Sequence, residues 1–236
     1  MPLLLFLEKW TFSSADKINV VSPAFLDHFK VILPNLSPSV YTNGVDKIFF
    51  KEKSLINKSQ KKITVLYVGN IGDGQGLHKI IPQAANELNH VEFKIIGDGS
   101  AKKLLTENFL FKSQNNIKVL NPILRRELLK EYDDADILFV HLNNHSAFKK
   151  VIPSKVFEYA ASGKPILAGV SGFVEKFLTD QVKGVEIFQP CNHKQMISCF
   201  HKLRNESKFY NRSDFCFKYD RERIMKKFAL DVLSLL

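Results

Sequence analysis

Short apolar runs alternate along the chain with longer segments whose apolar residues recur at helical spacing. Short continuous or alternating apolar runs predict strands, and apolar residues three or four positions apart predict amphipathic helices. The predicted strands are 15–22, 40–46, 61–68, 91–96, 116–120, 137–140, 165–168 and 184–188. The predicted helices are 1–16, 23–29, 78–88, 124–133, 153–163, 173–178, 192–203 and 214–236. This alternation indicates an α/β fold, a doubly wound parallel sheet with ligand-binding loops at the carboxyl ends of its strands.

The two ends of the chain carry helical patterns of different kinds. Residues 1–16 have no basic leader, and their apolar run is shorter than a typical signal-peptide core. They therefore predict the first turn of a buried helix and no targeting segment. In residues 214–236, four apolar residues share one helical face, which predicts an amphipathic terminal helix. These residues are Ile224, Phe228, Val232 and Leu235.

The composition is that of a globular protein with an excess of positive charge. The 236 residues are 45% hydrophobic and 25% charged, and their net charge of +10 indicates anionic partners. Residues 46–62 hold six Lys and residues 201–230 hold nine Lys or Arg. Both stretches are typical of solvated faces and, secondly, of contacts with anionic lipid. The three cysteines form no CxxC pair, so a reducing cytosol is the simplest interpretation.

A glycine-rich turn follows the predicted strand 61–68 directly and precedes a predicted helix. Strand, glycine-rich turn and helix form an arrangement that cradles phosphate. The glycines of residues 69–76 do not give the G-x-G-x-x-G fingerprint of dinucleotide sites, although Glu92 leaves an NAD site formally open. A second turn, with Gly97 and Asp98, follows the strand 91–96, and Ser100 is its predicted helix cap.

Residues 151–168 predict a loop, a helix, a turn and a strand in close succession. Pro153 suits the first helical turn and Gly163 suits the C-terminal cap. Lys155 and Glu158 are three residues apart, which places a cation and a carboxylate on one helical face. Phosphate on the helix start and a ribose on the carboxylate would suit a nucleotide. The simpler alternative is a capped helix with a solvated Lys/Glu pair.

Two further loops lie at predicted strand ends. The polar loop 141–150 carries His145, Lys149 and Lys150, and the amides after Gly172 start another helix that suits a diphosphate. The D-x-D pattern within residues 133–136 resembles a metal-binding motif. It lies at the end of a predicted helix, so a solvated helix terminus is the preferred interpretation.

Several of these motifs resemble one protein family. The stretch P-S-K-x-F-E-Y-x-A-x-G-K-P at 153–165 is similar to the donor-binding signature of retaining GT-B glycosyltransferases of family 4. The turn G-N-x-G-x-x-Q-G-L at 69–77 resembles the donor-domain loop of the branch that uses UDP-linked N-acetylamino sugars for bacterial O-antigen and capsule. The segments A-D-x-I-x-V-V-S at 15–22 and N-G-V-D at 43–46 resemble the end of an acceptor domain in the same enzymes.

The resemblance implies a domain organisation. Residues 1–45 would be the remnant of an N-terminal acceptor domain and residues 46–60 a linker. Residues 61–205 would form the Rossmann-like donor-nucleotide domain, and residues 206–236 would form a helix that crosses back to the N-terminal part. The chain would thus be the C-terminal, donor-binding half of a GT-B enzyme.

The resemblance also implies the site residues. Glu158 would hold the donor ribose, and Lys150 and Glu158 would be the catalytic residues. The implied donor-binding residues are Gly69, Asn70, Gly72, Gln75, Gly76, Gly97, Asp98, Leu120, Lys149, Pro153, Ser154, Lys155 and Gly172. Asn70 and Gln75 stand where the wider family has an arginine and a lysine on the diphosphate, and Lys150 stands where it has a sugar-gripping glutamate. No metal and no cofactor are expected.

The implied function is transfer of an N-acetylamino sugar from a UDP-sugar to a lipid-linked saccharide in bacterial surface polysaccharide biosynthesis. The enzyme would be cytoplasmic and peripheral on the inner face of the cytoplasmic membrane. Its partners would be the nucleotide-sugar donor, the lipid-linked acceptor, a separate acceptor-domain subunit and an anionic membrane surface. The alternatives are a non-catalytic truncated or split-subunit domain that binds nucleotide-sugar, and a UDP-sugar epimerase on the same fold. No nucleic-acid motif is present.

Overall fold

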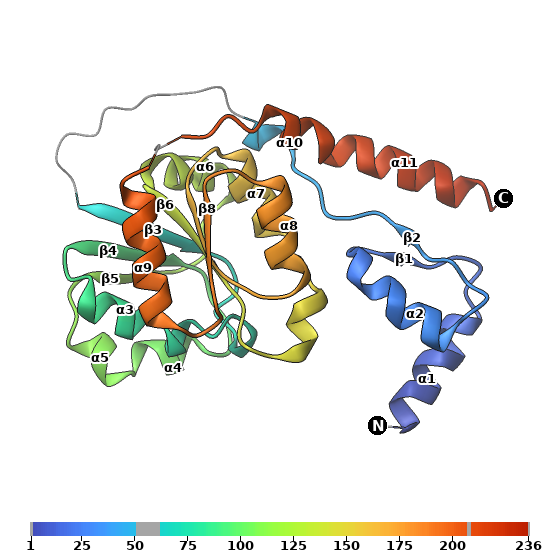
Figure 1. The fold of residues 1–236 in the computed structure, drawn as a ribbon, viewed down its shortest axis with the longest axis horizontal. Coiled ribbons are helices and arrows are strands. Elements are labelled where there is room, and N and C mark those ends of the chain that lie inside the picture. Colours follow the sequence, from blue (N-terminus) through green and yellow to red (C-terminus); the bar gives the residue numbers. More distant parts are fainter. Residues whose placement is uncertain (1, 51–61, 207–208, 236) are drawn as a thin grey trace.

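The computed structural model describes residues 2–50, 62–206 and 209–235, and it divides into a large and a small unit (Figure 1). The large unit is built on a six-stranded sheet, and the small unit is built on a two-stranded sheet. The last helix extends from the large unit along the small one (Figure 1). Most of the predicted linker 46–60 lies outside the described residues.

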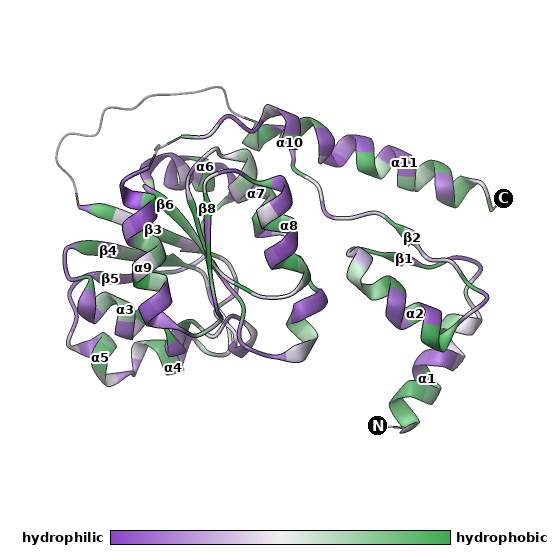
Figure 2. Cartoon of the chain, viewed as in Figure 1, coloured by the Kyte–Doolittle hydropathy of each residue, from purple (hydrophilic) through white to green (hydrophobic). Residues whose placement is uncertain are grey.

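The large sheet is entirely parallel, in the order β5-β4-β3-β6-β7-β8. The strands are β3 (Ile63–Val68), β4 (Val91–Ile96), β5 (Ile117–Leu120), β6 (Ile137–His141), β7 (Ile166–Gly169) and β8 (Val185–Phe188). The hydrophobic colouring of its central strands in Figure 2 fits a sheet that is covered on both faces. The predicted α/β fold with a doubly wound parallel sheet is confirmed.

Helices cover both faces of this sheet, and each face has its own hydrophobic core. The helices on one face are α3 (Ile81–Glu87), α4 (Lys102–Thr106), α5 (Phe109–Lys112) and α9 (His193–Arg204). The helices on the other are α6 (Arg125–Asp134), α7 (Lys155–Ala161), α8 (Phe173–Gln181) and α10 (Ser213–Lys218). Phe93 and Phe200 are fully buried in the first core and Phe157 in the second. The two cores fix the sheet rigidly, so its carboxyl edge is a stable platform.

The small unit contains α1 (Pro2–Ser13), β1 (Asn19–Val20), α2 (Leu26–Ile32) and β2 (Ser39–Val40). Ser22 caps the one-turn helix Pro23–Phe25 before α2, as predicted. The core of the small unit consists of Ile18, Val20, Phe29 and Ile32. The prediction that the N-terminal helix is buried is wrong, because α1 exposes five successive apolar side chains, Leu3 to Leu7. Nothing in the described chain packs over them.

The chain passes between the two units at two adjacent places. Val45 pairs with Asp220 in an isolated parallel bridge, in which Val45 donates its N–H to Tyr219 O and accepts from Arg221 N–H. Helix α11 (Arg221–Leu233) then runs along the small unit, where Asp231 pairs with Lys17 and accepts a 2.8 Å hydrogen bond from Ser39. The C-terminal helix therefore binds back onto the N-terminal part of the chain.

Three predicted helix boundaries are wrong. The segment 214–236 is not one helix: α10 ends at Lys218, and Asp220 caps α11 by accepting from two backbone N–H groups. The α-helix predicted at 78–88 begins only at Ile81, since Pro82 favours a helix start there. The residues before it form the one-turn helices Asp73–Gln75 and Leu77–Lys79. Helix α4 has Ala101 and not Ser100 at its N-cap.

Within residues 2–50, 62–206 and 209–235, no helix is both long enough and apolar enough to span a bilayer.

Candidate functional site

The candidate site lies where the two halves of the large sheet meet. Strands β3 and β6 are neighbours, and the chain leaves them toward opposite edges of the sheet. Loops that follow such strands diverge and leave a crevice at their carboxyl ends, where α/β proteins bind ligands. Val68 and His141 end the two strands and line this crevice.

Two adjoining cavities occupy the crevice. The β3–β6 cavity has a volume of about 310 Å³ and the β3–β4 cavity about 290 Å³. The first is lined by Tyr67, Val68, Gly69, Asn70, Gln75, Val140, His141, Leu142, Phe148, Val151, Pro153, Ser154, Lys155 and Tyr159. The second is lined by Val68, Gly69, Asn70, Ile96, Gly97, Asp98, Pro122, Ile123, Leu128 and Lys155. Because both include Gly69, Asn70 and Lys155, the cavities form one divided cleft.

The glycine turns after β3 and β4 are packed directly against each other. Gly69 donates its N–H to Ile96 O over 3.0 Å, and Ile71 donates to Asp98 O over 2.7 Å. A Cβ atom on Gly97 would lie 1.8 Å from the carbonyl oxygen of Gly69. The position therefore requires glycine, and the contact holds both turns at the mouth of the cleft.

Two amide side chains fasten the first turn internally. The Asn70 side chain donates to Gln75 Oε1 over 2.8 Å, and Gly72 N–H donates to the same oxygen over 3.1 Å. The Tyr67 hydroxyl donates to Asn70 O over 2.6 Å. Asn70 and Gln75 thus lie on the cavity wall, where their amide groups are neutral and also hold the turn together.

Helix α7 brings Lys155 to the wall of the cleft and Glu158 beside Lys155. Ser154 is its N-cap, and Gly163 follows its end with a φ of +73°, the left-handed conformation that favours glycine. The Lys155 ammonium donates to Glu158 Oε2 over 2.8 Å. Lys155 is the single cation among the residues that line the two cavities, all of which the structure describes. Lys155 and Gly69 thus share the cavity walls, and Glu158 is connected to them through Lys155.

A residue from another helix also binds this carboxylate. The Tyr132 hydroxyl on α6 donates to Glu158 Oε2 over 2.9 Å, and Tyr132 is 2% exposed. Burial, the neighbouring Tyr159 and the Glu158 charge all raise the pKa of Tyr132, so its hydroxyl stays protonated and donates. Tyr132 and Lys155 both donate to Oε2, whereas no described residue forms a hydrogen bond with the second carboxylate oxygen, Oε1. The sequence patterns did not identify Tyr132.

His141 is a second residue that the sequence analysis missed. It is 1% exposed, its Nδ1 lies 2.6 Å from Gln75 O, and Cys191 N–H donates to its Nε2 over 2.9 Å. Burial lowers the pKa of His141 to about 4, which keeps the ring neutral with Nδ1 as the donor. His141 thereby ties the glycine turn to the loop after β8. Its place at the carboxyl end of β6 is the signal that could have identified it.

Some predicted site residues lie outside the two cavities. Leu120 uses its carbonyl oxygen to accept from Gly97 N–H over 3.0 Å. Lys149 and Lys150 are exposed in the one-turn helix Ser146–Lys150, and Gly172 packs against Lys149, whose carbonyl a Cβ atom would approach to 2.6 Å. The predicted residues outside the cavity linings are Gly72, Gly76, Leu120, Lys149, Lys150, Glu158 and Gly172. Among these, Glu158 remains connected to the cleft through Lys155.

Two other features that the sequence suggested, a cofactor ribose contact at Glu92 and a metal-binding D-x-D pattern, lie away from the cleft. Glu92 lies near the amino end of β4 and pairs with Lys118, so it is at the wrong edge of the sheet to bind a cofactor ribose. Asp136, in the D-x-D pattern, accepts a 2.9 Å hydrogen bond from Thr64 N–H. Among the described residues, no three His, Cys, Asp or Glu side chains cluster as metal ligands would. The expected independence of metal remains a prediction.

A protein-family comparison matches most of the chain. The model of the family described as "Glycosyl transferases group 1" matches residues 47–214, which include the large sheet and both cavities. No curated protein sequence matches the chain.

Solved GT-B structures match the fold at low sequence identity. Sucrose-phosphate synthase from Thermosynechococcus elongatus matches 100% of this chain and 63% of its own, with a TM-score of 0.80 and 14% identity. HepE from Anabaena, in complex with UDP and glucose, matches 94% of this chain and 64% of its own, with a TM-score of 0.73 and 16% identity. The pneumococcal O-GlcNAc transferase, in complex with UDP and GlcNAc, matches 97% of this chain and 47% of its own, with a TM-score of 0.69 and 12% identity. The chain thus spans less than two thirds of the length of each of these three proteins.

Proposed function

Because the chain belongs to the group 1 glycosyltransferase family, we propose that it binds a nucleotide-sugar in the divided cleft and takes part in transfer of the glycosyl group. The proposed donor is a UDP-linked N-acetylamino sugar, and the proposed transfer retains the anomeric configuration. The observation that carries this proposal is Lys155, which lines both cavities and donates to Glu158.

The arrangement of charge fits a nucleoside diphosphate that spans both cavities. Lys155 lies on their shared wall, where an ammonium group would neutralise phosphate and stabilise it as a leaving group. The free oxygen of Glu158 would accept from ribose hydroxyl groups. The β3–β6 cavity, of about 310 Å³, would then hold the sugar, and the β3–β4 cavity, of about 290 Å³, would hold the base.

The wall of the β3–β4 cavity suits a planar base. Pro122 and Ile123, which follow β5, supply apolar surface, and Asp98, which follows β4, supplies polar groups. We assign the base to this cavity and the glycosyl group to the β3–β6 cavity. The UDP and glucose bound by HepE, and the UDP and GlcNAc bound by the pneumococcal transferase, are ligands of the same chemical class.

Titration calorimetry with UDP tests the donor proposal. We expect UDP to bind the purified chain more tightly than ADP or GDP, and UDP-N-acetylglucosamine to compete with it. An absence of binding by all three nucleotides would contradict the proposal.

The proposed acceptor is a lipid-linked saccharide in surface polysaccharide biosynthesis at the inner face of the cytoplasmic membrane. The net charge of +10 supports contact with an anionic lipid surface. Sedimentation with vesicles of anionic lipid, compared with vesicles of zwitterionic lipid, tests the location. We expect the chain to sediment with the anionic vesicles alone and to be released by salt.

The second candidate is a donor-binding half that is inactive without a further acceptor-binding segment. The exposed apolar side chains of α1 favour it, because in the described chain they have no apolar surface to pack against. Transfer by the purified chain to a lipid-linked acceptor distinguishes the candidates. UDP binding without transfer supports the second candidate, and transfer by the chain alone excludes it.

A further inference from the structure

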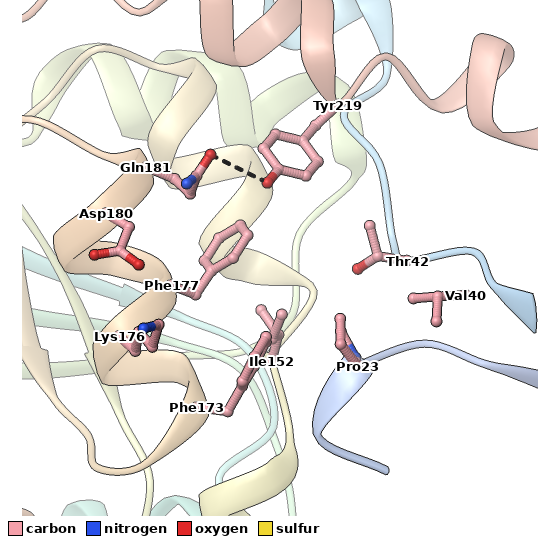
Figure 3. Close-up of a pocket in the computed structure, with 10 residues that line it drawn as sticks. All are labelled: Pro23, Val40, Thr42, Ile152, Phe173, Lys176, Phe177, Asp180, Gln181 and Tyr219. Carbon is pink, nitrogen blue, oxygen red and sulfur yellow. Dashed lines mark hydrogen bonds between the residues drawn. The ribbon is translucent and has the colours of Figure 1, made fainter. Parts of the chain in front are cut away.

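A third cavity lies between the large and the small unit. This interunit cavity has a volume of about 240 Å³ and is bounded by Pro23, Val40 and Thr42 on the small unit's side and by α8 on the other. Figure 3 shows Phe173 and Phe177 of α8, together with Ile152, on one side of this space and Thr42, Val40 and Pro23 on the other. Since ligand pockets usually exceed about 300 Å³, this cavity suits part of a larger ligand.

The surface of the interunit cavity is mainly apolar. Ile152, Phe173 and Phe177 form its wall on the large unit, and Val40 and Pro23 lie opposite. Lys176, Asp180 and Gln181 also line it, but apolar atoms supply most of its surface, and burying hydrocarbon against such a surface is favourable. The wall therefore selects an alkyl, prenyl or aromatic group.

One polar atom on this wall has no partner. Thr42 Oγ1 is buried, and no described residue forms a hydrogen bond with it. Gln181 Oε1, on the same wall, is already engaged, since it accepts from Lys218 over 2.6 Å and from the Tyr219 hydroxyl over 3.4 Å, and the charged side chains of Lys176 and Asp180 also line the cavity. A buried hydroxyl without a partner is unfavourable, so a ligand that reaches it gains a hydrogen bond that the protein alone does not make.

The interunit cavity shares a wall with the proposed donor site. Val151 and Pro153 line the β3–β6 cavity, whereas Ile152 between them lines the interunit cavity. Successive side chains of an extended segment point to opposite sides, and Val151 is extended, with φ of −94° and ψ of 139°. A single extended segment therefore separates the two cavities, and a ligand in one lies close to a ligand in the other.

We propose that the interunit cavity binds the apolar chain of an amphiphile that carries a hydroxyl, ether or amide group beside the chain, and that Thr42 hydrogen-bonds that group. Two sources present this chemistry, a lipid-linked acceptor and a free amphiphile. Only the first source rests on the proposed transfer function. The site itself stands on the apolar wall and on the unpartnered Thr42 hydroxyl.

Ligand-observed NMR and calorimetry with three probes test the site on the full chain. The probes are octyl β-D-glucoside below its micelle concentration, 1-octanol, and methyl β-D-glucoside. We expect octyl glucoside to bind and methyl glucoside not to bind. If UDP strengthens the binding of octyl glucoside but not of octanol, the source is a glycosylated acceptor. If UDP affects neither, the source is a free amphiphile. Equal binding of octyl and methyl glucoside overturns the proposal.

Two variants locate the probe. Thr42→Val keeps the side-chain shape and should lower the affinity for octyl glucoside about fivefold, which is the loss expected for one neutral hydrogen bond. Val40→Phe should fill the cavity and weaken the binding of octyl glucoside by more than about tenfold. Thr179→Val, on the exposed side of α8, is the matched control and should have no effect. UDP affinity should persist in all three variants, which separates this test from that of the donor site. Unchanged octyl glucoside affinity in both cavity variants overturns the proposal.

Discussion

The Tyr132 hydroxyl on α6 and the Glu158 carboxylate on α7 are joined by a 2.9 Å hydrogen bond, although 26 residues separate them. Lys155 donates to the same carboxylate oxygen over 2.8 Å. Two donors on one oxygen fix the rotamer of Glu158, and no described residue donates to its second oxygen. The carboxylate is therefore oriented before a ligand arrives, which reduces the entropic cost of binding.

Loss of the Glu158 carboxylate should weaken donor binding. We expect Glu158→Ala to lower UDP affinity roughly 10- to 100-fold, because a charged acceptor of ribose hydroxyl groups is removed. Glu175→Ala, in the first turn of α8 and outside both cavities, is the control. Calorimetry measures both affinities, and equal UDP affinity in the two variants would contradict the role of Glu158.

Removal of the Tyr132 hydroxyl should affect Glu158 rather than the ligand directly. We expect Tyr132→Phe to cost about 1–3 kcal/mol of unfolding free energy, since a buried hydrogen bond to a charged group is lost. If Tyr132 positions Glu158, the variant also loses part of its preference for UDP over 2′-deoxy-UDP. If Tyr132 has a purely structural role, the variant should bind both nucleotides more weakly by the same factor. Calorimetry with the two nucleotides distinguishes these results.

His141 should make stability depend on pH. Its pKa falls from 6.5 to about 4 on folding, chiefly by burial and, to a lesser degree, through nearby Lys79. Between these values the unfolded chain binds a proton that the folded chain does not. Stability is therefore complete above pH 6.5 and decreases as the pH falls toward 4, by about 3 kcal/mol in total.

Urea unfolding at several pH values measures this dependence. In His141→Gln the decrease between pH 6.5 and 4 should become smaller by about that amount. His145→Gln removes a histidine with a half-exposed side chain and should leave the dependence intact. If the unfolding free energy of His141→Gln changes with pH as it does in the wild type, the assignment to His141 is refuted.

The contact between the two glycine turns should tolerate no side chain. Gly97→Ala would place a Cβ atom 1.8 Å from Gly69 O, so we expect a loss of about 2 kcal/mol or more in unfolding free energy and weaker UDP binding. Gly74→Ala meets the end of the Phe148 ring at 2.8 Å, which can rotate away, and should cost much less. Thermal and urea unfolding compare the two variants, and similar losses would argue against a rigid contact.

The parts of the site that depend on local sequence were predictable. Three-residue spacing places Lys155 and Glu158 on one face of any helix, and a glycine turn after a buried strand reaches the sheet edge in any parallel fold. These features required only knowledge of the element type. The shared cavity wall at Gly69, Asn70 and Lys155 follows from them.

The parts that depend on packing between distant elements were not predictable. Tyr132 reaches Glu158 because α6 packs beside α7 on the sheet, and no helical pattern specifies that pairing. Gly172 was expected to point its helix start into the cleft, yet it packs on Lys149, and Phe173 after it lines the interunit cavity. The direction of a helix start depends on the loops around it, which periodicity does not describe.

The pairing of Val45 with Asp220 places both crossings between the units side by side. The hydrogen bonds from Val45 N–H to Tyr219 O and from Arg221 N–H to Val45 O hold these two crossings together. Displacement of one crossing would therefore displace the other, so the start of the linker and the start of α11 behave as one joint.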